Sequence, residues 1–218
     1  MNLNSVCYLA VDGREKPSSK VDFLCEIAHQ TNKMVSFGDV LILTASGAEK
    51  QYDNIRVVNI RNLDYIQYGK FIFNEAHHYT NKQHIMLFQD DGFLTHTEFW
   101  DDDFLSYDYI GAPWSHSFPW SRPGYEVGNG GFSLRSRRLY DECSKLRFVE
   151  GMNEDGLISI AYKDHLISRG IKFASVDVAR KFSFEYPFDE FHQINKTLGF
   201  HGKHNIEYGT KVLFNKKP

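Results

Sequence analysis

The feature of this sequence that most restricts its fold is an alternation of short apolar runs with amphipathic stretches in its first half. Apolar runs of strand length occupy residues 6–11, 40–43, 55–60 and 85–88. Between them, residues 18–28 carry apolar side chains at helical spacing, and a second helix is expected over residues 65–79. Buried strands separated by helices predict an α/β protein with a mostly parallel central sheet and helices on both faces.

The second half has a different composition. Glycine, proline and aromatic residues gather between Gly111 and Gly131, which indicates loops over a site. Beyond them we expect helices over residues 137–146 and 157–169, a strand over 171–174 and an irregular C-terminal end. The 218 residues fit one domain. We divide it into a first half (1–92), a second half (93–205) and a tail (206–218).

Charge and cysteine content restrict the class of protein. A formal net charge of −3 gives no electrostatic footprint for nucleic acid, so no nucleic-acid partner is expected. No apolar run approaches the ~18 residues of a transmembrane segment, and charged residues interrupt the first apolar run too early for a signal peptide. The cysteines Cys7, Cys25 and Cys143 are widely spaced. They are expected to be reduced core thiols of a cytoplasmic protein.

The strongest candidate site is the run Gln89-Asp90-Asp91-Gly92, directly after an apolar strand. In an open α/β sheet, ligands bind at the carboxyl ends of the strands, where Asp12 also falls. A buried carboxylate pair is costly without a partner, and a divalent cation is a natural one. In enzymes that use nucleotide sugars, Mn²⁺ or Mg²⁺ bridges the diphosphate. The alternative is a turn in which the two aspartates cap backbone amides.

Three further segments carry candidate chemistry. The glycine-rich stretch 127–136 permits close backbone approach to a ligand, or it forms a tight turn; it lacks the P-loop ending. Glu154 and Asp155 precede an apolar helical run, where acidic residues favour a helix start. A carboxylate there can also act as the general base for an acceptor hydroxyl. His201 is either a nitrogen ligand or a structural histidine.

Together these segments resemble a known family. The runs are QDDGF (89–93), WDDDF (100–104), YDYIGAPW (107–114), VGNGGFSLRS (127–136), ED (154–155), GIKFA (170–174), KFSFE (181–185) and GFHG (199–202). In this order they strongly resemble poorly characterised sugar-transferase domains of bacterial and viral polysaccharide loci, which are similar to the GT-A superfamily. The likeness extends from about residue 8 to residue 202.

The resemblance implies a single GT-A (Rossmann-like) domain and a metal-dependent hexosyl- or deoxyhexosyltransferase. It would move a sugar from a nucleotide-diphosphate donor, first of all a UDP-sugar, to a glycan acceptor. Asp91 is then the metal carboxylate and His201 the second ligand. The family usually has an aromatic residue where this chain has Asp90, so contact of Asp90 with the ion is left open. The acceptor region of inverting members implies Asp155 as base, with Glu154 as the alternate.

The same resemblance assigns the remaining binding residues. The base and ribose are expected near Ala10, Val11 and Asp12, and the donor along Gln89 and Asp90. The sugar and acceptor are expected near Asn129, Gly130 and Gly131, with Trp114 as a stacking surface. Three alternatives stay open: a retaining transferase without a dedicated base, a nucleotide-sugar hydrolase or nucleotidyltransferase, and a non-catalytic glycan-binding domain.

Overall fold

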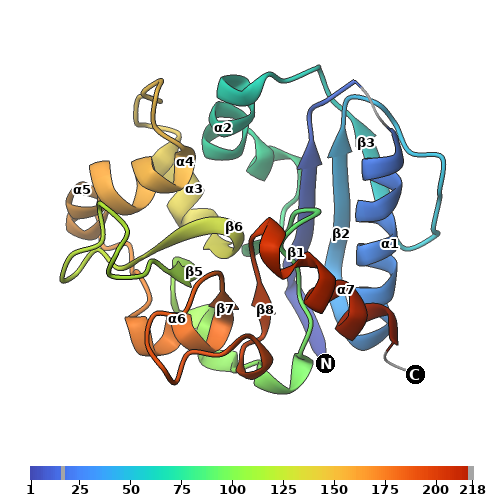
Figure 1. Cartoon of the computed structure of the whole chain (residues 1–218). Helices are drawn as coiled ribbons and strands as arrows, with labels where there is room; N and C mark the ends of the chain where they lie inside the picture. Colours follow the sequence, from blue (N-terminus) through green and yellow to red (C-terminus); the bar gives the residue numbers. More distant parts are fainter. Residues whose placement is uncertain (16–17, 216–218) are drawn as a thin grey trace.

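Residues 1–15 and 18–215, which the computed structural model describes, form a six-stranded sheet with helices on both faces (Figure 1). The strands are β1 (Asn2–Asp12), β2 (Ser36–Thr44), β3 (Arg56–Asn59), β4 (His84–Leu87), β5 (Tyr109–Pro113) and β6 (Val127–Ser136). Their order is β3-β2-β1-β4-β6-β5. The first four are parallel, and β6 runs antiparallel to both β4 and β5.

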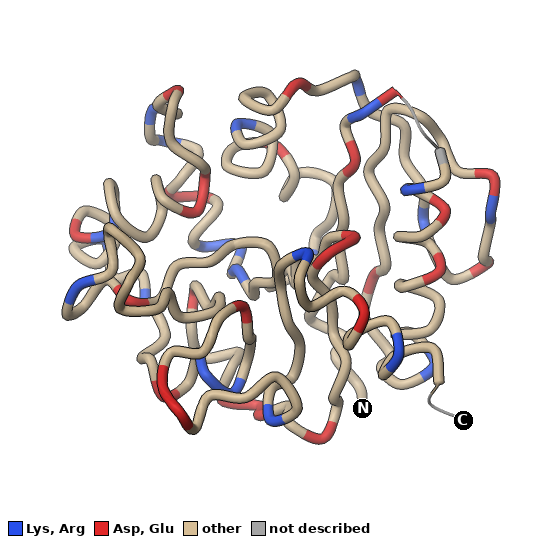
Figure 2. The backbone as a smooth tube through the Cα atoms, in the orientation of Figure 1, with Lys and Arg blue, Asp and Glu red and all other residues tan. Residues whose placement is uncertain are grey.

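The helices that cover the sheet are short apart from the first. They are α1 (Ser18–Met34), α2 (Tyr65–Asn74), α3 (Arg137–Cys143), α4 (Glu154–Gly156), α5 (Lys163–Ser168), α6 (Val176–Phe182) and α7 (Ile206–Asn215). A two-stranded parallel pair, β7 (Ser183–Phe184) and β8 (Gly199–Phe200), lies beside the main sheet. Basic and acidic residues are interspersed around the molecule (Figure 2).

The alternation of side chains along β1 divides the core into two layers. Val6, Tyr8 and Ala10 pack on the face covered by α1 and α7. Cys7 and Leu9 point to the opposite face, which α2 and α3 cover. Because a strand directs successive side chains to opposite faces, a central strand buried on both faces is continuously apolar. The prediction of a buried strand at residues 6–11 is therefore confirmed.

The four strands expected in the first half are confirmed, and so is the mostly parallel sheet. The three cysteines are free and buried, as expected. The expected helix over 65–79 ends at Asn74 and continues as a separate 3₁₀ turn, Ala76–Tyr79. The helix expected over 157–169 is divided, because a π turn, Leu157–Ala161, joins α4 to α5.

One expectation for the second half is confirmed in part and another is wrong. In the region between Gly111 and Gly131, residues 114–126 form the connection between β5 and β6, and only the two ends of the region belong to these strands. Its glycines serve close strand packing, since a Cβ on Gly111 would lie 1.8 Å from the Asn129 carbonyl oxygen. Residues 171–174 form no strand; a single bridge joins Phe173 to Tyr109 beside β5.

The C-terminal end is also more ordered than expected. Residues 206–215 form α7, which packs on α1 with Phe214 stacked against Phe23 at 6.3 Å. Leu213 is 2% exposed in the main core, so the segment expected to be a tail belongs to the domain. Lys211 lies on the exposed side of this helix. No helix in the described part of the chain is long and apolar enough to cross a membrane.

Shortening Leu213 tests whether α7 stabilises the domain. We expect Leu213→Ala to lower the free energy of unfolding by about 2–5 kcal/mol, the cost of a buried leucine cavity. Lys211→Ala on the exposed side of the same helix is the control and should change it by less than about 0.5 kcal/mol. Urea denaturation of both variants measures the difference. An equally small effect for Leu213→Ala would mean that α7 is dispensable for folding.

Candidate functional site

Two adjoining cavities open where β1 and β4 end, and they share a wall. The first has a volume of about 620 Å³ and is lined by parts of α2, β6, α4 and the turn after β8. The second has a volume of about 450 Å³ and lies over the ends of β1 and α2. Four residues line both cavities: Tyr65, Tyr68, Gln89 and Asp91. The two cavities therefore form one divided cleft at the sheet edge where ligands of α/β proteins bind.

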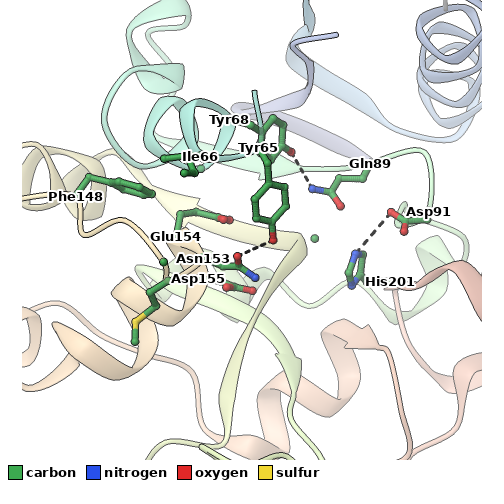
Figure 3. A pocket seen from close by; sticks show the side chains of 14 residues that line it. Tyr65, Ile66, Tyr68, Gln89, Asp91, Phe148, Asn153, Glu154, Asp155 and His201 are labelled. Carbon is green, nitrogen blue, oxygen red and sulfur yellow. Dashed lines mark hydrogen bonds and ion pairs between the residues drawn. The ribbon is translucent and has the colours of Figure 1, made fainter. Parts of the chain in front are cut away.

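Asp91 is held in this shared wall by a tight turn after β4. Gln89 N donates to the Gly92 carbonyl at 2.7 Å, and Gly92 N donates back to the Gln89 carbonyl at 3.2 Å. The Gln89 side chain donates to the Tyr68 hydroxyl at 2.8 Å, which fixes the turn against α2 (Figure 3). The carboxylate of Asp91 is therefore placed at the cavity edge by backbone pairing.

His201 reaches Asp91 from the other end of the chain. Its Nε2 lies 3.6 Å from Asp91 Oδ1 (Figure 3), and its Nδ1 lies 3.2 Å from Glu185 Oε1. Burial of the ring lowers its pKa, but the hydrogen bond to Glu185 and the charges of Glu185 and Asp91 outweigh this, so the pKa of His201 is raised. Glu185 is held in turn by Asn129 Nδ2, which donates to it at 2.9 Å.

The Asp91–His201 pair fits a divalent cation. One carboxylate oxygen and one imidazole nitrogen face the same cavity, and ligands at ~2.0–2.2 Å from one ion lie roughly 3–4 Å apart. A carboxylate on the second ring nitrogen, here Glu185, is the usual support of a metal-bound histidine. Within residues 1–15 and 18–215 no group of three such side chains meets at one point. Mg²⁺ in nucleotide sites takes one or two carboxylates, and phosphate and water supply the other ligands.

Asp90 differs from its neighbour. It lines only the second cavity, where its Oδ2 pairs with Lys20 Nζ at 2.9 Å. The structure therefore brings together Asp91 and His201, while Asp90 is engaged by a lysine.

The acidic pair of α4 forms another part of the first cavity. Asp155 accepts two backbone hydrogen bonds, from Gly130 N at 3.0 Å and from Gly156 N at 2.7 Å. Burial, followed by the charge of Glu154, raises the pKa of Asp155 to about 7. Glu154 Oε1 accepts from Arg135 at 3.0 Å. The two acids thus differ: Glu154 has a guanidinium partner, and Asp155 does not.

Arg135 and the cations of the second cavity are residues that the sequence did not reveal. Arg135 is fully buried in β6, and nothing in the run Leu134-Arg135-Ser136 distinguishes it from an exposed strand arginine. Among the described residues, three cations line the second cavity: Arg14, Lys20 and Lys203. Single basic residues far apart in sequence carry no signal until the fold brings them together.

Some of the predicted binding residues line the second cavity, some line the first, and some lie behind the lining. Val11 and Asp12 line the second cavity, and Asp12 is held by two hydrogen bonds from the Arg14 guanidinium, at 2.7 and 2.9 Å. Gln89 and Gly131 line the first cavity. Gly130 lies behind Gly131, where its amide supports Asp155.

Four predicted binding residues line neither cavity: Ala10, Trp114, Asn129 and Gly130. Asn129 and Gly130 instead hold Glu185 and Asp155 by hydrogen bonds. Ala10 is fully buried in the core on the α1 side and lines neither cavity, because alternation along β1 directs it away from Val11. Trp114 is also buried and outside both cavities; it stacks on Phe118 at 4.9 Å and packs over Gly128. It is a core aromatic of the 114–126 connection.

Comparison with known proteins agrees with this architecture. A family model described as "Protein of unknown function (DUF5672)" matches residues 54–201, and the chain belongs to this family. No curated protein matches the sequence. One similar solved structure is a glycosyltransferase involved in the glycosylation of the major capsid of PBCV-1, at 12% identity and a TM-score of 0.55. That alignment covers 95% of this chain and 99% of the other.

A second similar structure is an active-site mutant of LgtC, at 14% identity and a TM-score of 0.56, covering 100% of this chain and 98% of that one. At such low identities the likeness concerns the fold alone. The expected fold class is confirmed: the chain is an α/β domain of the GT-A type with a mostly parallel central sheet flanked by helices.

The raised pKa of Asp155 predicts a pH-dependent stability. The folded protein holds the proton of the Asp155 carboxyl more tightly than the unfolded chain does, since the pKa of an unfolded aspartate is ~3.9. The free energy of unfolding therefore falls as pH rises from about 4 to about 7. The slope from one proton is at most about 1.4 kcal/mol per pH unit. Asp155→Asn should remove this component, as measured by denaturation at several pH values. Asp103→Asn, an exposed aspartate, is the control; parallel curves for wild type and Asp155→Asn would contradict the assignment.

Proposed function

We propose that this protein is a metal-dependent glycosyltransferase that transfers a sugar from a nucleotide-diphosphate donor, first of all a UDP-sugar, to an acceptor glycan. One observation carries the proposal: Asp91 stands in the wall shared by two cavities, and His201 meets it there at 3.6 Å. A cation at that point would lie between a nucleotide and an acceptor. The GT-A type of fold supports the same interpretation.

The second cavity suits the donor nucleotide. Its apolar residues Val11, Leu24 and Leu63 offer a surface for the base. The cations Lys20 and Lys203 line the same cavity and would offset the charge of the diphosphate. Without them, phosphates beside Asp91 would face like charge.

Asp91 and His201 would hold Mn²⁺ or Mg²⁺ in this site. The ion, when bound, supplies charge neutralisation for the departing nucleoside diphosphate. Glu185 orients the His201 ring so that Nε2 faces Asp91, and Asn129 fixes Glu185. These contacts order the ligands before the nucleotide arrives.

Asp155 is proposed as the general base of an inverting reaction. Its pKa of about 7 lies near the operating pH, where a base is most effective. It would accept the proton of the acceptor hydroxyl while the acceptor oxygen attacks the sugar carbon opposite the leaving diphosphate. Glu154 suits this role less, because its carboxylate already accepts a hydrogen bond from the buried Arg135 guanidinium.

Nucleotide binding is expected to depend on a divalent cation. Asp91→Asn should sharply weaken UDP binding in the presence of Mn²⁺ while the fold stays intact. His201→Ala should lower the metal affinity roughly 10-fold or more, the loss found when metal sites are disturbed. Calorimetric titration of UDP with Mn²⁺ and with EDTA measures both.

The control for the metal site is His204→Ala, which lies close to His201 in sequence. His204 is exposed; its Nε2 contacts the Glu185 carbonyl and Asn205, and its ring stacks on Tyr186 at 4.4 Å. It should change the affinity much less than His201→Ala. UDP affinity that is unchanged in EDTA would overturn the metal-dependent proposal.

Removal of the proposed base is expected to affect turnover and not donor binding. Once a thermal-shift screen of nucleotide sugars with Mn²⁺ has identified a donor, Asp155→Asn should lower kcat by about 10²–10⁴-fold. Wild-type activity should rise with pH through about 7, since the carboxyl must be ionised to accept a proton. The Asp155→Asn variant should not show this rise of activity with pH.

Product stereochemistry by NMR gives an independent check on the base. Inversion at the anomeric carbon is expected. Retention, or near wild-type turnover of Asp155→Asn, would remove the reason for a base at this position.

A further inference from the structure

The two cavities differ in charge. Among the described residues, no lysine or arginine lines the first cavity, whereas Asp91, Glu154 and Asp155 do. The second cavity is lined by Arg14, Lys20 and Lys203 and also by Asp12, Asp64, Asp90 and Asp91; Arg14 pairs with Asp12, and Lys20 pairs with Asp90. An anionic group would therefore find cationic side chains in the second cavity and, within the described residues, none in the first.

The first cavity also has an apolar side. Ile66, Phe148 and Met152 line it, together with the ring of Tyr65, and in Figure 3 Ile66 and Phe148 lie on the side away from Asp91 and His201. Ile66 is 45% exposed and Tyr65 75% exposed. An exposed apolar surface beside polar groups is typical of a ligand site.

This apolar side is built from two segments that are fixed to each other. The Tyr65 hydroxyl donates to Asn153 Oδ1 at 2.7 Å, which joins the start of α2 to the residue before Glu154 (Figure 3). The Phe148 ring packs edge-on against Phe73 at 5.8 Å. It also lies over Gly69, where a Cβ would be 3.2 Å away. The apolar wall and the acidic pair therefore keep one mutual position.

The wall extends outward from the cavity. Val149 follows Phe148 and is 45% exposed, and Trp120 lies near Gly156 beside Met152. The apolar surface thus begins next to the acidic pair and continues to the protein surface, as a site for an amphipathic molecule requires.

We propose that the first cavity takes an acceptor that is uncharged and carries an alkyl or aryl group beside its reacting hydroxyl. The inference rests on the proposed function, because it is the acidic pair that makes this cavity the acceptor side. The hydroxyl lies toward Asp155, and the alkyl or aryl group lies on Ile66, Phe148 and Met152. An acceptor with a carboxylate or phosphate near the hydroxyl is disfavoured, because that group would meet acidic side chains and no described lysine or arginine in this cavity.

The test compares binding of methyl and hexyl β-glycosides of glucose, galactose and mannose, below their micelle concentrations, to the protein with Mn²⁺ and UDP. Within a pair, the hexyl compound should bind about tenfold tighter or more, since roughly two buried methylenes give that factor. Hexyl glucuronide, which carries a carboxylate, should not show this tenfold gain in affinity. Ile66→Ser should reduce the preference for the hexyl chain severalfold; Ile167→Ser, an equally exposed isoleucine (49%) on α5, should not.

Binding of UDP with Mn²⁺ is measured in every variant and separates the two hypotheses. If UDP binds but no hexyl glycoside binds better than its methyl partner, the acceptor inference is overturned and the proposed function stands. The same conclusion follows if Ile66→Ser and Ile167→Ser change the preference for the hexyl chain equally, or if the glucuronide binds most tightly of the hexyl compounds. Loss of UDP binding in the wild type would instead overturn the proposed function.

Discussion

The site depends on the absence of side chains at two consecutive positions of β6. A Cβ on Gly131 would lie 2.1 Å from the His201 ring, and a Cβ on Gly130 would lie 2.9 Å from the Asp155 Cβ. Any larger residue would displace the histidine or the acidic helix. Because β6 is paired on both sides, with β4 and with β5, it brings His201 and Asp155, which are far apart in sequence, against one rigid backbone. The Gly130 amide then uses this proximity to bind Asp155.

A buried guanidinium extends the same arrangement. Arg135 donates to the Gly130 carbonyl at 3.3 Å and to Glu154 at 3.0 Å. One cation therefore supports both the glycine backbone of β6 and the acidic pair. Removing one partner of a buried ion pair costs about 3–5 kcal/mol, which makes such a pair a strong constraint on position. The ion pair also distinguishes the two acids. Glu154 is paired with Arg135, and the charge of Glu154 contributes to the raised pKa of Asp155.

Much of the fold could be predicted from the sequence, because burial on both faces gives the parallel strands an unbroken apolar signal. The errors come from places where tertiary contacts override local composition. Glycines normally indicate loops, yet Gly111 and Gly128 allow β5, β6 and Trp114 to approach closely. The 171–174 segment has the composition of a strand, but only Phe173 finds a strand to pair with.

Site residues could be located from the sequence where they belong to a local motif. They could not be located where their role depends on which residues the fold brings together. The turn at Asp91 could be located from the sequence because it follows a buried strand, and the resemblance added His201. Arg135, Tyr65 and Lys20 carry no such signal, since their importance comes from which residue the fold places opposite them: Glu154, Asn153 and Asp90. Trp114 shows the reverse, an aromatic that suggested a sugar platform and instead fills the core.

The C-terminal segment links the folding core to the cleft. Gly209 of α7 lies against the Phe200 ring, where a Cβ would be 1.9 Å away, and Phe200 immediately precedes His201. Lys203, two residues further on, lines the second cavity, while His201 lines the first. One turn therefore supplies a nitrogen to the first cavity and a cation to the second. Because α7 packs both on α1 and on the 3₁₀ turn Lys203–Asn205, it supports this turn, although none of its described residues lines either cavity.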